Sequence, residues 1–428
     1  MIRIIRFIAV WIFLAVFSVS ALGSATLASG ESVPPRLKWK TREITIAVSG
    51  SLTGPSSNII NGSDVYKAIR QSLAAWEAAA NIKFNIVNSD RLNVSPSGVR
   101  GDGVNLITIA QSPENILLFE RDPDGLSATT RVFYNKRNSI TEADIVLNPY
   151  QQFSTDGIFG TYDLQSTLTH EIGHLLGLGH SMIAGATMFD HYGKNGLFGM
   201  PNFNARTLSV SDISAVTALY GAKDLDDDCC AAVHGNISKS GSQRTIWIED
   251  ALTGQLLQAV NAGNADNFGF DDLTGGAYTV YSQENNASGI KTGVFDLAAD
   301  DQKNIEFPDN NSSAKGALKF IGLNGELSDQ SITLNADRTY SVYVGGQGFG
   351  KEYVKIGMDS PFFTVFEDKN LIHDYGRSFL VLSTQIRVSR DAPPGIYSVY
   401  FETSDGSRYY LPGAISVESF ENPWGSAN

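Results

Sequence analysis

The chain has 428 residues, of which 42% are hydrophobic, and its formal net charge is −13. A chain of this length can build two or three separate hydrophobic cores. Because the charge balance is acidic and no basic run occurs beyond the first few residues, nucleic acid is excluded as an expected partner.

The N-terminus has the pattern of a secretory signal. Arg3 and Arg6 precede an apolar run at residues 7–22, and small residues follow it. This order is typical of a signal peptide, which we place at residues 1–28, so a secreted or extracellular protein is expected. The alternative is a membrane anchor formed by the same run if it stays uncleaved. No other segment of the sequence is apolar enough to span a bilayer.

The segment between residues 36 and 170 has the pattern of helices packed on a sheet. Apolar side chains recur at helical spacing from residue 65 to residue 80, and Ser63 precedes them as a candidate N-cap. Runs rich in β-branched residues, typical of strands, follow this helix. They lie at residues 82–87, 104–110, 128–134 and 143–147. We therefore expect a mixed, mostly parallel sheet covered by helices.

The run HEIGHLLGLGH, from His170 to His180, carries the clearest chemistry. Residues four apart on a helix share a face, so His170 and His174 point the same way, with Glu171 beside them. Gly177 can adopt a positive φ and end the helix, so that His180 approaches from another direction. Three imidazoles leave the fourth position of a tetrahedral zinc ion open to water, as in catalytic zinc sites.

The plain alternative is a buried helix that carries histidines by chance. The clustering argues against it, since this run holds three of only six histidines in the chain. The sequence therefore predicts a metal-ligand set.

The run resembles the zinc motif of the metzincin metallopeptidases, HExxHxxGxxH. The residue after the third histidine, Ser181, is similar to the one found at this position in the matrixins, the family of the matrix metalloproteinases. Residues 185–189 resemble the Met-turn of that family, in which Met188 would lie beneath the metal. Residues 65–84 and 208–221 are similar to its first helix with the next strand and to its last helix.

The resemblance implies a matrixin-like zinc peptidase domain at residues 36–222. His170, His174 and His180 would bind one catalytic zinc ion per chain, and Glu171 would act as the general base while the ion activates water. The expected function is zinc-dependent endopeptidase activity on protein or peptide substrates.

The resemblance also suggests where a substrate binds. We expect an extended peptide to lie along an edge strand near Gly125, Leu126, Ser127 and Ala128, since backbone pairing holds a peptide independently of its sequence. The loop at residues 189–206 is expected to set specificity. His191 in this loop is expected to be a loop residue, because the three-histidine set is already complete.

One departure from the animal matrixins concerns further metals. No histidine precedes His170, so the structural zinc ion of those enzymes has no histidine ligand here. Calcium held by Asp122, Asp124 or Asp156 is the alternative, although each of these aspartates suits a turn equally well.

Beyond residue 222 the composition changes. Residues 223–232 are acidic and are expected to form a linker that contains the only cysteines, Cys229 and Cys230. Adjacent cysteines cannot link distant parts of the chain, and the sequence leaves their role open.

Two all-β modules are expected after this linker. Residues 233–308 resemble the β-sandwich modules similar to the carboxypeptidase regulatory domain, and residues 309–315, rich in Asn and Ser, form a second linker. Residues 316–420 resemble immunoglobulin-like modules of bacterial surface proteins. Trp247 in the first module suits either a core or a binding face. The expected fold is an α+β metzincin-type catalytic domain followed by two β-sandwich modules.

A function of another class remains as the alternative. The β modules make up nearly half of the chain, which would suit a secreted or surface adhesin with a vestigial or self-processing peptidase domain. The intact motif counts against it. Because that motif is complete within residues 36–223, we expect this fragment to fold and to cleave unstructured substrate alone. The sequence does not indicate an oligomeric state.

Overall fold

A computed structural model describes most of the chain beyond residue 36. The described residues are 37–54, 58–96, 100–120, 122–181, 183–191, 193–223, 231–237, 244–261, 267–308, 316–349, 354–374 and 379–418. The expected signal peptide, the linker at residues 309–315 and both cysteines lie outside these residues, as does most of the acidic linker. No helix within the described ranges is long and apolar enough to cross a bilayer.

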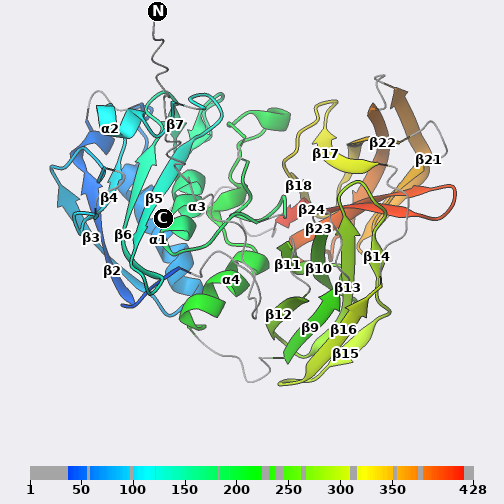
Figure 1. Ribbon diagram of the computed structural model, residues 1–428. Helices are drawn as coiled ribbons and strands as arrows, with labels where there is room; N and C mark the ends of the chain where they lie inside the picture. Colours follow the sequence, from blue (N-terminus) through cyan, green and yellow to red (C-terminus); the bar gives the residue numbers. More distant parts are fainter. Residues whose placement is uncertain are drawn as a thin grey trace, which may run out of the picture.

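Three regions can be distinguished by their sheets, and Figure 1 shows the first on one side of the molecule and the other two on the opposite side. We call them the N-terminal region (residues 37–223), the middle module (231–308) and the C-terminal module (316–418).

The N-terminal region contains a six-stranded sheet in the order β1-β6-β4-β2-β3, with β5 paired to β6. Its strands are β1 (Lys38–Trp39), β2 (Glu43–Ser49), β3 (Lys83–Ser89), β4 (Asn105–Thr108), β5 (Ala128–Tyr134) and β6 (Ser139–Leu147). Every pairing is parallel except that of β5 with β6. The sheet is thus mixed and mostly parallel, as the sequence pattern predicts.

Helices and short elements complete this region. They are α1 (Val65–Ala79), α2 (Pro113–Ile116), α3 (Leu164–Leu175) and α4 (Val210–Tyr220), the 3-10 turns η1 (Gly50–Leu52), η2 (Leu197–Gly199) and η3 (Asn204–Arg206), and the paired strands β7 (Phe153–Ser154) and β8 (Tyr162–Asp163). The apolar faces of α1 and α3 meet in the main core, where Trp76 is fully buried. Its indole Nε1 donates to the Thr169 carbonyl at 2.8 Å, which fixes the distance between the two helices.

The start of α1 differs from the prediction by one residue. Asp64, not Ser63, is the N-cap, and its carboxylate accepts a hydrogen bond from the Lys67 backbone N–H at 2.9 Å. Both residue types cap helices well, so the sequence alone favours neither.

The middle module consists of a five-stranded sheet, β11-β10-β13-β14 with β15 on β13, and a three-stranded sheet, β12-β9-β16. The strands are β9 (Ala231–Ile237), β10 (Arg244–Asp250), β11 (Leu256–Asn261), β12 (Asn267–Leu273), β13 (Gly276–Glu284), β14 (Ile290–Lys291), β15 (Phe295–Leu297) and β16 (Gln302–Phe307). Side chains of both sheets share one buried apolar core.

The C-terminal module has two four-stranded sheets, β17-β19-β22-β21 and β18-β24-β23-β20. The strands are β17 (Ala317–Leu323), β18 (Ile332–Asn335), β19 (Thr339–Gln347), β20 (Val354–Gly357), β21 (Phe363–Asp374), β22 (Phe379–Val388), β23 (Gly395–Thr403) and β24 (Arg408–Glu418). Alternate residues of the strands face a common core, as in a sandwich of two sheets.

A fourth buried apolar cluster joins all three regions, and we call it the junction cluster. It contains Ile183 and Ala186 of the N-terminal region, Trp247, Leu256 and Tyr281 of the middle module, and Ile396, Tyr400 and Tyr410 of the C-terminal module. Trp247 is fully buried and stacks on Tyr281, with ring centroids 5.1 Å apart. It is therefore a core residue of the junction.

Glu249 is a buried acid beside the junction cluster. Its Oε1 accepts hydrogen bonds from Trp247 Nε1 at 2.9 Å and from Ser398 Oγ at 2.7 Å, so it links the two modules. Burial raises the pKa of Glu249 to about 7, and the charge of Asp359 acts in the same direction.

Glu249 is expected to make stability depend on pH. Since its pKa is higher in the folded state, its contribution of about 3 kcal/mol is complete below the unfolded pKa and is lost as the pH rises through 7. Glu249→Gln removes this titration and keeps an acceptor. We expect the melting temperature of the wild type to fall more between pH 5 and pH 8 than that of Glu249→Gln. Equal falls in the two proteins would contradict the assignment.

Candidate metal centre

Helix α3 supplies two of the three imidazoles. The helix is capped by Asp163, whose carboxylate accepts a hydrogen bond from the Ser166 backbone N–H at 2.9 Å. His170 and His174 lie one turn apart on the helix, with ring centroids 4.6 Å apart.

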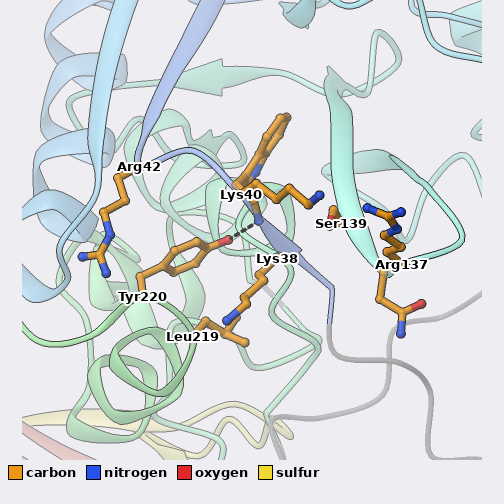
Figure 2. A pocket seen from close by; sticks show the side chains of 9 residues that line it. Lys38, Lys40, Arg42, Arg137, Ser139, Leu219 and Tyr220 are labelled. Atoms are coloured by element: carbon orange, nitrogen blue, oxygen red, sulfur yellow. Dashed lines mark hydrogen bonds between the residues drawn. The ribbon is translucent and has the colours of Figure 1, made fainter.

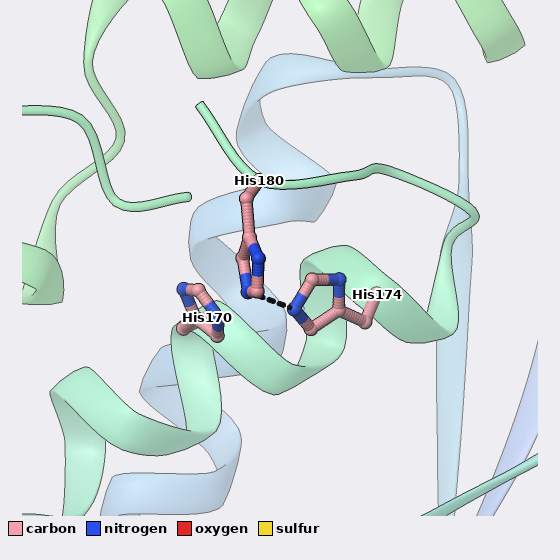
Figure 3. A group of neighbouring side chains, drawn as sticks. All are labelled: His170, His174 and His180. Carbon is pink, nitrogen blue, oxygen red and sulfur yellow. Dashed lines mark hydrogen bonds between the residues drawn. The ribbon is translucent and has the colours of Figure 1, made fainter. Parts of the chain in front are cut away.

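The third imidazole arrives after a sharp turn of the chain. Gly177 has a φ of 94°, and a Cβ there would overlap the Leu37 carbonyl, so both the backbone conformation and the space require glycine. The chain then returns, and the His180 ring centroid lies 5.3 Å from that of His170 and 4.7 Å from that of His174. Figure 3 shows the three rings around a common point.

The hydrogen bonds of the rings fit a metal ion at that point. His170 Nδ1 lies 2.8 Å from the Thr187 carbonyl and His174 Nδ1 lies 2.9 Å from the Leu178 carbonyl, and because carbonyls only accept, each Nδ1 carries the proton. The Nε2 atoms are therefore left with lone pairs. His174 Nε2 and His180 Nε2 are 3.1 Å apart, close to the roughly 3.3 Å between two nitrogens of a tetrahedral zinc ion.

The electrostatics also favour neutral ligands. Burial, with the charges of His174 and His180, lowers the pKa of His170 well below its usual value, and burial and His180 lower that of His174 to about 4. Neutral imidazole is the form that binds a metal ion. Within the described ranges, this trio is the one group of three or more metal-binding side chains close enough to share an ion.

Glu171 lies beside the trio and is held from the sheet. It is 4% exposed, and Thr130 Oγ1 on β5 donates to its Oε2 at 2.6 Å. Burial raises the pKa of Glu171 to about 7, and the hydrogen bond from Thr130 acts in the opposite direction. The sequence pattern gave no indication of Thr130, because its contact joins residues that are 41 positions apart.

Met188 packs against helix α3 at Gly173. It is 2% exposed, and a Cβ on Gly173 would overlap its sulfur, so the helix and the turn are in direct contact. Its backbone N–H donates to Asp212 Oδ1 at 3.1 Å, and the Thr187 N–H donates to Asp212 Oδ2 at 2.8 Å.

Asp212 thus has a role that the sequence analysis missed. It forms the capping box of α4 with Ser209, and the same carboxylate accepts hydrogen bonds from the backbone N–H groups of Thr187 and Met188. The capping pattern is visible in the sequence. The second set of hydrogen bonds depends on tertiary contact and is not.

Met188→Leu is expected to retain zinc and much of any activity. A volume-conserving change in an apolar floor costs less than about 1.5 kcal/mol. Zinc content and the melting temperature would check this, with Met200→Leu as a control because Met200 is 36% exposed. Loss of zinc in Met188→Leu alone would show that the sulfur does more than fill space.

The residues predicted to bind substrate lead into the edge strand β5. Gly125 donates its N–H to Asp122 Oδ1 at 2.8 Å, so Asp122 acts as a turn residue. Leu126 is 38% exposed, whereas Ser127 and Ala128 are buried. Because Thr130 of the same strand reaches Glu171, β5 runs along the candidate metal centre.

A pocket of about 360 Å³ lies near the C-terminal end of α3, lined in part by Lys38, Lys40, Arg42 and Arg137 (Figure 2). Two of its lining residues, Trp39 and Tyr220, support the end of α3. Trp39 Nε1 donates to the Leu175 carbonyl at 2.8 Å, and the Tyr220 hydroxyl donates to the Leu176 carbonyl at 2.6 Å. These bonds satisfy carbonyls that the end of a helix leaves unpaired.

Comparisons with known proteins match the N-terminal region. Residues 38–221 match the model of the family described as Matrixin. The chain is 26% identical over 202 residues to matrix metalloproteinase-20 of Homo sapiens, covering 47% of this chain and 36% of that protein. It is 26% identical over 197 residues to metalloendoproteinase 1-MMP of Arabidopsis thaliana, covering 43% of this chain and 44% of that protein. The chain therefore spans less than half the length of these curated relatives.

The solved structures that align are more distant. The major pilin subunit BcpA of Bacillus cereus aligns with 44% of this chain and 69% of its own, with a TM-score of 0.15 and 13% identity. A likeness of this size supports no argument about the fold.

Proposed function

Residues 38–221 form a matrixin-like catalytic domain, and from this we propose that the protein is a secreted zinc-dependent endopeptidase. The observation that carries the proposal is the convergence of three neutral imidazoles beside a buried carboxylate. Relatives of this family are metalloproteases, so protein or peptide substrates follow for this chain.

The mechanism follows from the groups at the site. His170, His174 and His180 would hold the ion, which when bound polarises the scissile carbonyl and lowers the pKa of water. Glu171 takes the proton of the attacking water and passes it to the leaving amine. Thr130 holds the carboxylate in place for both transfers.

The substrate would bind as an extended strand. A peptide lying along β5, near Gly125, Leu126, Ser127 and Ala128, would pass beside Glu171. The loop at residues 189–206 would form the wall that selects a substrate side chain. Secretion is proposed from the signal pattern at residues 1–28.

Hydrolysis of denatured casein by the purified full-length chain tests the proposal. We expect about one zinc ion per chain, hydrolysis that a chelator stops, and recovery when zinc is added back. A chain that binds zinc and leaves casein intact would instead favour the adhesin alternative. A chain that binds no zinc would overturn the metal assignment itself.

A further inference from the structure

The loop at residues 189–206 connects the candidate metal centre to the C-terminal module. It begins beside the third histidine. There the Ser181 N–H donates to the Met188 carbonyl at 2.7 Å, and Ser181 forms an isolated parallel β-bridge with Phe189. It ends at Arg206, whose guanidinium forms two hydrogen bonds, of 2.9 and 2.7 Å, with Asp163 at the start of α3. Both ends of the loop are thus fixed to the elements that carry the histidines.

The middle of the loop is buried in the other module. Phe198 is 5% exposed and belongs to the core cluster of the C-terminal module, together with Leu323, Ile332 and Leu334. An aromatic side chain inserted into another module's core fixes the position of its own backbone.

Polar contacts hold the same point. The Phe198 N–H donates to Glu326 Oε2 at 2.8 Å, and Asn324 Nδ2 donates to the Phe198 carbonyl at 3.3 Å. Phe198 has a φ of 55°, a left-handed conformation that is unfavourable for a bulky residue. Such a conformation persists only where the surroundings over-determine it, and these contacts supply that constraint.

Two further hydrogen bonds tie the loop to β18 and to the turn before it. Thr333 Oγ1 donates to Asn204 Oδ1 at 2.6 Å, and Asn202 Nδ2 donates to Gln330 Oε1 at 3.4 Å. The loop is therefore attached to the C-terminal module over most of its length.

The segment between His180 and Met188 also packs against the β modules, through contacts that do not involve Phe198. Ile183, between His180 and Met188, is fully buried in the junction cluster. A Cβ on Gly185 would overlap Ile396 of the C-terminal module, which shows how closely the two regions approach. Both segments that follow the third histidine thus rest on the β modules.

We propose that the C-terminal module is part of the peptidase's substrate site, and that Phe198 is the positioning residue through which this module sets the shape of the specificity loop. The inference rests on the proposed peptidase function. It reverses the expectation that residues 36–223 cleave substrate alone, because that fragment would leave Phe198 and Ile183 without their partners.

The test uses the full-length chain and two variants of the anchor. Phe198→Ala removes the inserted ring, and the double variant Asn324→Ala/Glu326→Ala removes the polar contacts while leaving the apolar core intact. Phe349→Ala is the matched control, since Phe349 is 6% exposed in the same cluster and packs on Phe401 and Tyr409. It weakens the module without touching the anchor.

Hydrolysis is measured on peptides that differ only in the side chain after the cleaved bond. Both anchor variants should change the ratio of kcat/KM between large and small side chains by about tenfold. They should also speed hydrogen exchange at residues 193–202, with zinc content unchanged. Phe349→Ala should do neither.

The possible results distinguish a failure of the proposed anchor role of Phe198 from a failure of the proposed peptidase function. An unchanged ratio in the anchor variants, with wild-type hydrolysis intact, overturns this inference alone, as does an equal change in Phe349→Ala. A wild-type chain that binds zinc and cleaves no peptide overturns the proposed function itself.

Discussion

Glu171→Ala is expected to keep the zinc ion and to lower kcat for peptide hydrolysis by about 10²- to 10⁴-fold, the usual contribution of a positioned general base. The three imidazoles are untouched by this change, and the Nδ1 atoms of His170 and His174 bond the backbone carbonyls of Thr187 and Leu178, not Glu171. Zinc content and steady-state kinetics on one peptide would measure both halves of the result.

Thr130→Val is the companion variant. It removes the hydrogen bond to Glu171 Oε2 but keeps the carboxylate, so a smaller loss of activity is expected than for Glu171→Ala. Near-normal turnover in Glu171→Ala would show that another group accepts the proton, and the assigned mechanism would fall.

His174→Ala is expected to abolish zinc binding and, with it, all hydrolysis. Two imidazoles would remain, and removing a direct ligand should cost more than the 10- to 100-fold loss of affinity typical of groups that only orient a ligand. Equilibrium dialysis against zinc would measure the loss.

His191→Ala provides the control for this variant. His191 is in the specificity loop, and its Nδ1 lies 2.7 Å from Asp190 Oδ1 on an exposed surface. It should bind zinc as the wild type does. If His191→Ala lost the ion and His174→Ala kept it, the ligand set would be assigned wrongly.

Local patterns in the sequence were sufficient to predict the parts of the site that lie close together in the chain. The spacing of His170, His174 and His180 predicted the cluster, since it depends on helix geometry and one glycine turn. The edge strand β5 and the capping box of α4 were likewise visible as short-range patterns.

The remaining features depend on contacts between distant residues. In the sequence, nothing distinguishes Phe198 from other loop aromatics. Its role depends on contact with Glu326, which is 128 positions away in the chain. Trp247 suited a core or a binding face, and only the packing of three regions around it settles the choice. For Asp212, the sequence pattern indicates the capping contact with Ser209. It does not indicate the hydrogen bond from the Met188 N–H to the other carboxylate oxygen, because that contact joins distant residues.

The hydrogen bonds at the end of α3 bear on the order in which the chain is made. The carbonyls of Leu175 and Leu176 are paired by Trp39, near the start of the N-terminal region, and by Tyr220, at its end. When a chain emerges from the ribosome, Leu176 precedes its partner Tyr220 by 44 residues. Helix α3 therefore gains its full set of hydrogen-bond partners only after the whole region has been synthesised, so a nascent chain lacks the support of the helix end that carries His174.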